Sequence, residues 1–365
     1  MKIAEIIKYI ETFAPLSLQD DFDNSGLQIG NIYSEINGVL LCLNITEKVI
    51  DEAIEKSCNL IISHHPLLFK SLKKITNQTY IERCIIKSCQ NNITIFSAHT
   101  NLDNTIEGIN FYLAKKIGLK NTHTLKIKKN YLLKLVTFVP IQQIETVKKA
   151  LFNAGAGNIG NYNSCSFSST GNGSFKSCKN SHTFIGECDK FHEVKEVRLE
   201  IVLPIYKKEK ILHALLKSHP YEEPAYDFYP LLNSCNKIGS GITGELNYNE
   251  NEELFLKKIK TIFNLKIIKH SPFTGKIVNK IAICSGNGSF LIKDAIACQA
   301  DVFLTGEAKY NDYYYVEDKI LLVVIGHYES ECYAKHIFFD AISKKMPNIT
   351  VYLSEMDKNP VIYYK

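Results

Sequence analysis

The sequence predicts an α/β fold in two halves, interrupted by a smaller α+β domain. Compact apolar runs alternate with helical patterns in the first third of the chain, and this alternation returns in the last third. The middle differs, because two similar strand–helix units flank a stretch rich in Gly, Asn and Ser. Apolar strands that alternate with helices are typical of sheets covered by helices on both faces.

The first third contains three apolar runs, each followed by a helical pattern. We expect strands at Gly38–Asn44, Asn59–Ser63 and Ile93–Ala98, and helices at Thr46–Asn59, Tyr80–Gln90 and Asn104–Ile117. Thr46 is a suitable N-cap for the first of these helices.

The last third also alternates apolar runs with helical patterns. We expect strands at Lys280–Cys284, Asp301–Leu304, Ile320–Ile325 and Ile349–Leu353, with helices at Phe290–Cys298 and from His327 to about Lys345. The two thirds form the predicted halves, Met1–Leu125 and Asn236–Lys365.

The middle repeats one unit, a strand that ends in proline and then a helix. Strands at Lys134–Val139 and Val197–Leu203 each precede such a proline, and residues 153–181 are expected to form loops. Two such units with strands between them indicate a ferredoxin-like βαββαβ layer. We therefore expect an inserted ferredoxin-like α+β domain at Lys126–Cys235.

The composition is that of a globular protein of about two domains. The chain has 365 residues, 45% hydrophobic and 22% charged, and its 11 cysteines include no Cys-x-x-Cys pair. Scattered thiols fit a reducing cytoplasm, and no apolar run suggests a signal peptide or a membrane span. A net charge of +5, with acids interleaved among the lysines, does not favour a nucleic-acid partner. We expect a cytoplasmic protein without a membrane partner.

Residues that commonly bind metals follow three of the predicted strands. They lie in Ser63–Pro66, Ala98–Asp103 and Gly326–Glu331, and ligands of open α/β sheets bind beyond the carboxyl ends of strands. If a helix begins near His327, then His327 and Glu331 share one face of it. The adjacent His64 and His65 can diverge towards two ions at a strand–loop junction.

This set predicts a dinuclear metal centre. Its five candidate ligands are His64, His65, Asp103, His327 and Glu331. A carboxylate can bridge two ions that lie about 3.5–4 Å apart. Imidazole and carboxylate ligands suit zinc, iron, manganese, cobalt or nickel without choosing among them.

Two further residues are candidate catalytic groups. His99 could be a ligand, a group that orients a ligand, or an acid/base for a substrate. Glu307 follows another strand and is either a pocket carboxylate or an exposed acid. The motif Gly-Asn-Gly-Ser-Phe occurs at Gly171–Phe175 and Gly286–Phe290, where it could bind an anion or form a tight turn.

The sequence resembles the GTP cyclohydrolase I type 2 homologs, the interacting-factor-three-like dinuclear metal family. The resemblance rests on Asp23–Leu27, Ser63–Leu67, Ala98–Asp103, Thr305–Glu307 and Gly326–Glu331, which follow one another across nearly the whole chain. The middle segment, with Gly155–Gly160 and His219–Pro224, looks like the additional domain of longer bacterial members, similar to PII and CutA-type trimers. Phe22, Asn287 and Asn311 depart from residues that the family often has.

The resemblance implies two divalent ions held by the five residues, with Glu331 as the bridge, and a toroidal homohexamer. It also implies a metal-dependent hydrolase of a small molecule, in which His99 or Glu307 moves protons. The family name suggests attack on the purine ring of GTP. The alternative is a metal-binding regulatory or scaffold oligomer without catalytic turnover.

Overall fold

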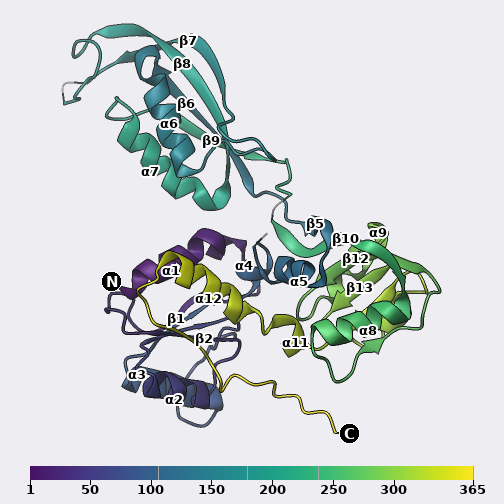
Figure 1. Cartoon of the computed structure of the whole chain (residues 1–365). Coiled ribbons are helices and arrows are strands. Elements are labelled where there is room, and N and C mark those ends of the chain that lie inside the picture. The colour runs from purple at the N-terminus through teal and green to yellow at the C-terminus, as the bar shows by residue number, and fades with distance from the viewer. Residues whose placement is uncertain (106, 179, 237, 365) are drawn as a thin grey trace. The chain divides into compact units, whose positions relative to one another are not determined.

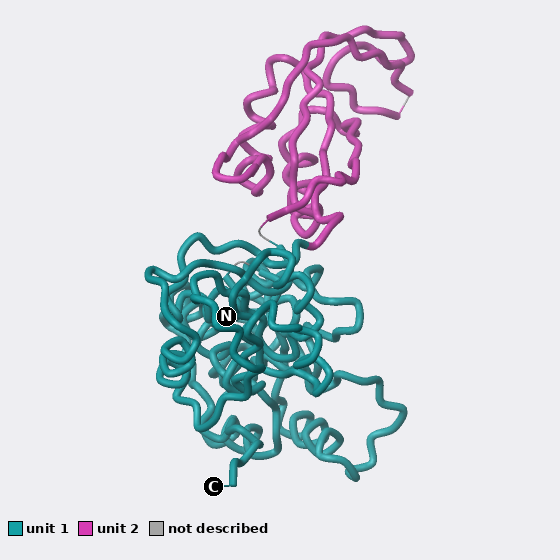
Figure 2. Tube along the Cα trace, turned by 90° about the vertical axis from the view of Figure 1, so that its right-hand side faces the viewer, with its two compact units in different colours: residues 1–127, 237–365 teal, residues 128–236 magenta. Residues whose placement is uncertain are grey.

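The computed structural model describes residues 1–105, 107–178, 180–236 and 238–364. Ile106, in a predicted helix, and Lys365, the predicted end of the second half, lie outside the described residues. The chain divides into two compact units, coloured separately in Figure 2. Unit 1 comprises residues 1–127 and 237–365, and unit 2 comprises residues 128–236.

The first sheet of unit 1 has the strand order β1-β4-β3-β2-β15, and only β1 is antiparallel to its neighbour. Its strands are β1 (Gly26–Ile29), β2 (Val39–Cys42), β3 (Leu60–Ser63), β4 (Thr94–Ser97) and β15 (Val351–Leu353). Its helices are α1 (Ile3–Phe13), α2 (Glu47–Glu55), α3 (Tyr80–Gln90) and α12 (Ala334–Lys345). Figure 1 shows α1 and α12 on one face of this sheet and α2 and α3 on the other.

Alternating side chains explain why helices cover both faces of the first sheet. Leu41 and Ile62 pack with α1 and α12, whereas their neighbours Leu40 and Ile61 pack with α2 and α3. Successive side chains of a strand point to opposite faces, so an uninterrupted apolar strand requires cover on both.

The second sheet of unit 1 has the strand order β11-β14-β13-β12-β10-β5, with β12, β13 and β14 parallel. Its strands are β5 (Lys120–Ile127), β10 (Gly239–Asn251), β11 (Lys269–His270), β12 (Ile277–Cys284), β13 (Val302–Thr305) and β14 (Leu321–Val324). The remaining helices of unit 1 are α4 (Thr100–Asp103), α5 (Ile109–Ile117), α8 (Glu252–Ile262), α9 (Ile292–Ala297), α10 (Asp312–Tyr315) and α11 (His327–Glu331), with short 3-10 helices at Leu16–Leu18 and Ser289–Leu291.

The two halves of unit 1 exchange strands and share a core. β15 comes from the C-terminal half but pairs with β2, and β5 comes from the N-terminal half but pairs with β10. One apolar cluster contains Leu41 and Ile62 of the first sheet together with Ile283 and Leu304 of the second. The two sheets are therefore held against each other by common packing.

Unit 2 has the element order β6-α6-β7-β8-α7-β9 and one antiparallel sheet, β7-β8-β6-β9. Its elements are β6 (Leu132–Pro140), α6 (Ile144–Ala154), β7 (Phe167–Lys176), β8 (Phe191–Pro204), α7 (Lys208–Ser218) and β9 (Tyr226–Leu231), with 3-10 helices at Ile141–Gln143 and Ile205–Lys207. Leu135 and Ile201 pack against Leu151 of α6 and Leu215 of α7, which forms a core belonging to this unit alone.

The loop predicted across residues 164–181 is wrong over most of its length. Residues 167–176 form β7, which pairs with β8 along all of its ten residues. This strand lies at an edge of the sheet and is largely exposed, so its Gly, Ser and Asn residues give no apolar alternation to read. The first Gly-Asn-Gly-Ser-Phe motif is accordingly part of a strand and not a turn.

The predicted helix at Tyr80–Gln90 is confirmed, as is the cap of α2, where the Thr46 hydroxyl accepts a hydrogen bond from the N–H of Val49. The other two long predictions need correction. Of the helix predicted at Asn104–Ile117, only α5 at Ile109–Ile117 forms, and the separate short helix α4 lies before it. Residues 107 and 108 form a turn, and a Cβ at Gly108 would lie 1.7 Å from the Leu102 carbonyl oxygen. The 327–345 pattern becomes α11 and α12.

Among the described residues, every helix is too short or too polar to cross a membrane.

We predict that Glu52→Gln destabilises unit 1 at neutral pH. The buried Glu52 carboxylate accepts hydrogen bonds from Ser354 and from the backbone N–H groups of Glu355 and Met356. Burial raises the pKa of this carboxyl group, but these hydrogen bonds outweigh burial and hold the pKa below 4.5. The stabilisation is therefore present above about pH 4.5 and is lost as the pH falls through the folded-state pKa.

Urea unfolding near neutral pH should show a loss of about 1–3 kcal/mol for Glu52→Gln, and the difference from wild type should shrink in acid. Glu55→Gln, at an exposed position of the same helix, is the matched control. Equal losses for the two variants would contradict the prediction.

Candidate metal centre

The parallel strands of both sheets of unit 1 end at the same place. His64 and His65 follow β3 and His99 follows β4 in the first sheet, whereas Glu307 and His327 follow β13 and β14 in the second. His65 Nε2 lies 2.9 Å from Glu331 Oε2, so groups from the two sheets are in direct contact.

Glu331 lies at the centre of this cluster. It is 3% exposed and belongs to α11, which begins after Gly326 at a positive φ of 108°. Its Oε2 contacts Nε2 of His65 at 2.9 Å and Nε2 of His327 at 2.8 Å, whereas its Oε1 lies 3.9 Å from Nε2 of His64. The two carboxylate oxygens thus face different groups of side chains.

His64 and Asp103 leave two buried polar atoms without partners. Nε2 of His64 and Oδ1 of Asp103 are 3.8 Å apart, and neither has a hydrogen-bond partner among the described residues. Buried polar atoms are almost always satisfied, and a cation bound by both atoms would satisfy them together. The donor set therefore fits a metal ion.

Three groups of residues have ligand atoms close enough to hold a metal ion, each within 4.8 Å of one another. They are His64 with Asp103 and Glu331, His65 with His327 and Glu331, and His64 with His65 and His99. Glu331 belongs to two of these groups. All five predicted ligands are brought together, and His99 lies beside them.

The second nitrogen of each predicted histidine ligand is held by another group. Nδ1 of His64 lies 2.9 Å from the Ala98 carbonyl, and Nδ1 of His65 lies 2.8 Å from Oδ1 of Asn44. Nδ1 of His327 lies 2.9 Å from Oε1 of Glu307. Such contacts fix the tautomer and the orientation of a metal-binding imidazole. Glu307 thus lies behind His327, as a group that orients it.

His99 is paired with Asp23, a residue to which sequence reasoning gave no role. Nδ1 of His99 lies 2.8 Å from Oδ1 of Asp23, and the other carboxylate oxygen accepts hydrogen bonds from the N–H and hydroxyl of Thr100. Burial, the largest single influence, would lower the pKa of His99, but the hydrogen bond to Asp23 and the charges of Asp103, Asp23 and Glu331 together raise it. An Nδ1–H held by Asp23 leaves Nε2 as the acceptor nitrogen.

Sequence reasoning missed Asp23 and Asn44 as partners because both lie far along the chain from the histidines they hold. The only available signals were the position of Asn44 at the end of a predicted strand and the presence of Asp23 in one of the family-like motifs.

Burial and the surrounding charges shift the pKa values of the two carboxyl groups of the site in opposite directions. Burial, with Glu331 nearby, raises the pKa of Asp103 well above its ordinary value. Burial acts on Glu331 in the same direction, but hydrogen bonds from His327 and His65 hold its pKa well below the ordinary value. Burial lowers the pKa of His64, which favours the neutral imidazole that metals bind.

Gly286 forms the wall beside Glu331. A Cβ at this position would lie 2.1 Å from Oε1 of Glu331, and the residue has a positive φ of 57°. Its N–H donates to the Ser330 hydroxyl at 3.0 Å, and its carbonyl accepts from the N–H of Glu307 at 2.8 Å. The second Gly-Asn-Gly-Ser-Phe motif therefore brings backbone close to a carboxylate.

We predict that Gly286→Ala weakens divalent-metal binding about tenfold or more, because the methyl group must displace Glu331. Gly275→Ala is the matched control, since its φ is also positive, at 74°, but no atom lies within 4 Å of the place that its methyl group would take. Calorimetric titration with Mn²⁺ measures both variants. Equal affinity for Gly286→Ala and Gly275→Ala would contradict the prediction.

Comparisons with known proteins agree with the sequence resemblance. Residues 1–360 match the model of the family described as Duf34/NIF3 (NGG1p interacting factor 3). A Halalkalibacterium halodurans protein named GTP cyclohydrolase 1 type 2 homolog is 39% identical over 315 residues, covering 85% of each chain. A Bacillus subtilis protein of the same name is 36% identical over 368 residues and 98% of each chain.

A solved structure supports the same relationship. The Bacillus cereus protein related to NIF3 has a TM-score of 0.87 and 34% sequence identity, with 100% of this chain and 99% of that chain covered. The mixed α/β fold is thus that of NIF3-related structures, and the chain belongs to the Duf34/NIF3 family.

Proposed function

We propose that unit 1 binds two divalent metal ions and that Glu331 bridges them. The observation that carries this proposal is the position of the two Glu331 oxygens. Oε2 contacts His65 and His327, whereas Oε1 lies 3.9 Å from Nε2 of His64, which forms a ligand group with Asp103 and Glu331. One carboxylate that belongs to two ligand groups is the arrangement expected of a bridge between two ions.

The donor set supports a borderline or hard divalent metal. The three groups that could hold an ion contain imidazole nitrogens and carboxylate oxygens and no thiol. This chemistry suits zinc, iron, manganese, cobalt or nickel. Five protein ligands for two ions also leave coordination positions open, as catalytic sites require.

We further propose that the centre is a metal-dependent hydrolase. Two bound ions would supply Lewis-acid polarisation and a water of lowered pKa. In this proposal His99 would take up or release a proton through Nε2, and the contact of its Nδ1 with Asp23 supports the tautomer that this requires. Glu307 would keep His327 oriented. Because the relatives carry the name GTP cyclohydrolase 1 type 2 homolog, GTP is the first substrate to test.

A regulatory or scaffold role is the second candidate. It is favoured by unit 2, which has its own core and the strand order β7-β8-β6-β9 expected of a ferredoxin-like insert. In this case metal binding would persist without turnover of any substrate. The family resemblance also supports a homohexamer. Sedimentation at micromolar concentration tests this assembly, and a monomer would contradict it.

We predict about two ions per chain for the wild type after dialysis, and near zero for Glu331→Ala, because a lost bridge weakens both sites. His64→Ala and His65→Ala should each retain about one ion, since the two imidazoles belong to different halves of the centre. His327→Ala should also retain about one. Elemental analysis measures the stoichiometry.

His213→Ala is the control for these substitutions, because His213 is an exposed residue of α7 in unit 2. It should keep the wild-type metal content. Wild-type protein with at most one ion under every loading condition would overturn the dinuclear proposal. Glu331→Ala that retains both ions would remove only the bridge.

We predict that Asp23→Asn lowers the hydrolytic kcat about a hundredfold or more without changing the metal content. The amide conserves the volume of the buried carboxylate but no longer favours the His99 tautomer that can accept a proton at Nε2. Turnover of GTP by the metal-loaded protein measures the effect, with Asp21→Asn, at an exposed neighbouring position, as the control.

An unchanged kcat for Asp23→Asn would remove His99 from the proposed chemistry. No turnover by the fully metal-loaded wild type, with GTP and with a panel of other small molecules, would favour the regulatory candidate.

A further inference from the structure

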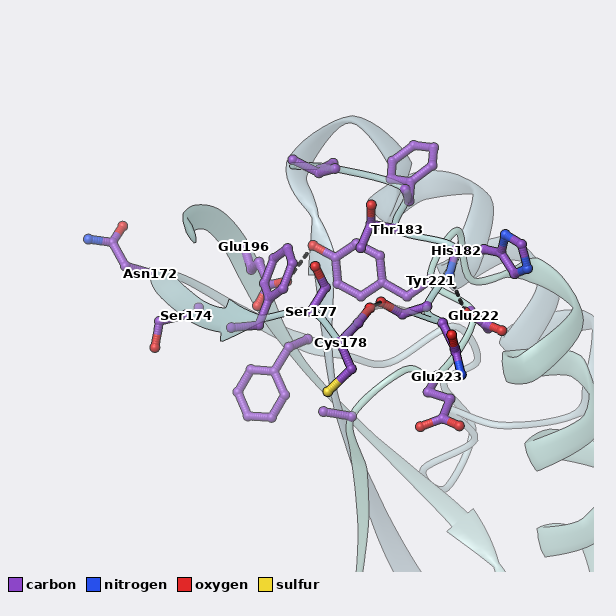
Figure 3. A pocket seen from close by; sticks show the side chains of 18 residues that line it. Asn172, Ser174, Ser177, Cys178, His182, Thr183, Glu196, Tyr221, Glu222 and Glu223 are labelled. Atoms are coloured by element: carbon purple, nitrogen blue, oxygen red, sulfur yellow. Dashed lines mark hydrogen bonds between the residues drawn. The ribbon is translucent and has the colours of Figure 1, made fainter. Parts of the chain in front are cut away.

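A cavity of about 760 Å³ lies within unit 2, whereas the candidate metal ligands belong to unit 1. It is lined by the end of β6, by β7 and β8, and by residues 177, 178, 180–185, 221–223 and 225 (Figure 3). This volume is in the range of small-molecule binding sites. The proposed hydrolase chemistry does not use this cavity.

One wall of the cavity is aromatic. The ring of Tyr221 lies 6.4 Å from that of Phe175 and 6.3 Å from that of Phe184, measured between centroids. His219 supports this wall from behind, because its ring lies 5.1 Å from that of Tyr221 and its Nδ1 accepts the N–H of Tyr221 at 3.1 Å. The wall is therefore held in place and offers ring faces to a ligand.

Beside the aromatic wall, the cavity contains a carboxylate that is nearly buried. Glu196 on β8 is 9% exposed, and its Oε1 accepts a hydrogen bond of 2.7 Å from the Tyr221 hydroxyl, drawn in Figure 3. The carboxyl group is accommodated because residue 173 is glycine, where a Cβ would lie 2.1 Å from Oε2 of Glu196. Within the described part of the chain, Oε2 receives no hydrogen bond and Glu196 forms no ion pair.

The charged residues among the described residues that line the cavity are all acidic. Glu222 and Glu223 lie at its rim, and Glu222 accepts the backbone N–H of His182 at 2.9 Å. The described residues that line the cavity include no lysine and no arginine. A nearly buried carboxylate without a cationic partner is costly, and a bound cation would offset that cost.

The described donors around the cavity do not favour a metal ion as its occupant. Among the described residues, groups of three ligands close enough to hold an ion occur at His64, His65, His99, Asp103, His327 and Glu331, all in unit 1. In the cavity one carboxylate lies beside a group of aromatic rings instead. Aromatic faces attract organic cations and pack against apolar bodies.

We propose that the unit 2 cavity binds a small organic amine, whose ammonium group meets Glu196 and whose apolar body packs against Phe175, Tyr221 and Phe184. This role is independent of the proposed hydrolase chemistry. It gives the insert a ligand of its own, which recognises a cation where the repeated glycine motif had suggested an anion.

The experiment compares three probes that share one body and differ in charge. The metal-loaded full-length protein is titrated calorimetrically with 2-phenylethylamine, 2-phenylethanol and phenylacetate. We expect the amine to bind at least about tenfold more tightly than the alcohol, and phenylacetate to bind more weakly still. Absence of amine binding up to about 10 mM, or equal binding of all three probes, would overturn the proposal.

Substitutions then locate the binding site. Glu196→Gln should weaken amine binding about tenfold or more, whereas Glu193→Gln, at an exposed position of the same strand, should leave it unchanged. An unchanged affinity in Glu196→Gln would place any amine elsewhere and overturn the proposal. The comparison of the three probes on the wild type keeps the test decisive if Glu196→Gln folds poorly.

Discussion

The structure of unit 1 depends on one buried carboxylate, Glu331. A charge so deeply buried persists only where surrounding groups replace water, and three imidazoles from both sheets do so here. These contacts impose close approaches on the backbone, because α11 begins only after a positive φ at Gly326 and Gly286 leaves no room for a side chain. The contacts that stabilise the Glu331 carboxylate therefore also join the two halves of unit 1.

The strand exchange explains how the two halves hold this cluster rigidly. β15 returns from the second half to pair with β2, and the segment that follows it places Asp357 where its carboxylate accepts the N–H of Leu43 at the end of that strand. One shared apolar core then lies between the sheets. Ligand groups that come from different sheets can keep their mutual distances only if the sheets cannot slide, and close-packed interiors resist such sliding.

The sequence predicts those parts of the molecule whose residues reflect local rules. Apolar strands such as β3 and β13 are evident because both faces are buried, and the N-cap of α2 is evident from Thr46. β7 was missed because an exposed edge strand needs no apolar pattern. The break between α11 and α12 was missed because the linking residues Cys332 and Tyr333 keep helical backbone angles and include no helix-breaking residue. Asp23 and Asn44 were missed as partners because only the folded chain brings them to His99 and His65.

The two units solve the burial of a carboxylate in different ways, and the difference bears on what each can bind. Glu331 is surrounded by imidazoles whose other nitrogens are already held, so its environment is fixed in advance for a metal ion. Glu196 receives one neutral hydroxyl donor, from Tyr221, and lines a cavity together with aromatic rings. A single neutral hydrogen bond compensates a nearly buried charge less than an ionised donor does. Among the described residues of unit 2, Glu196 has no cationic partner. A bound cationic ligand would supply that partner.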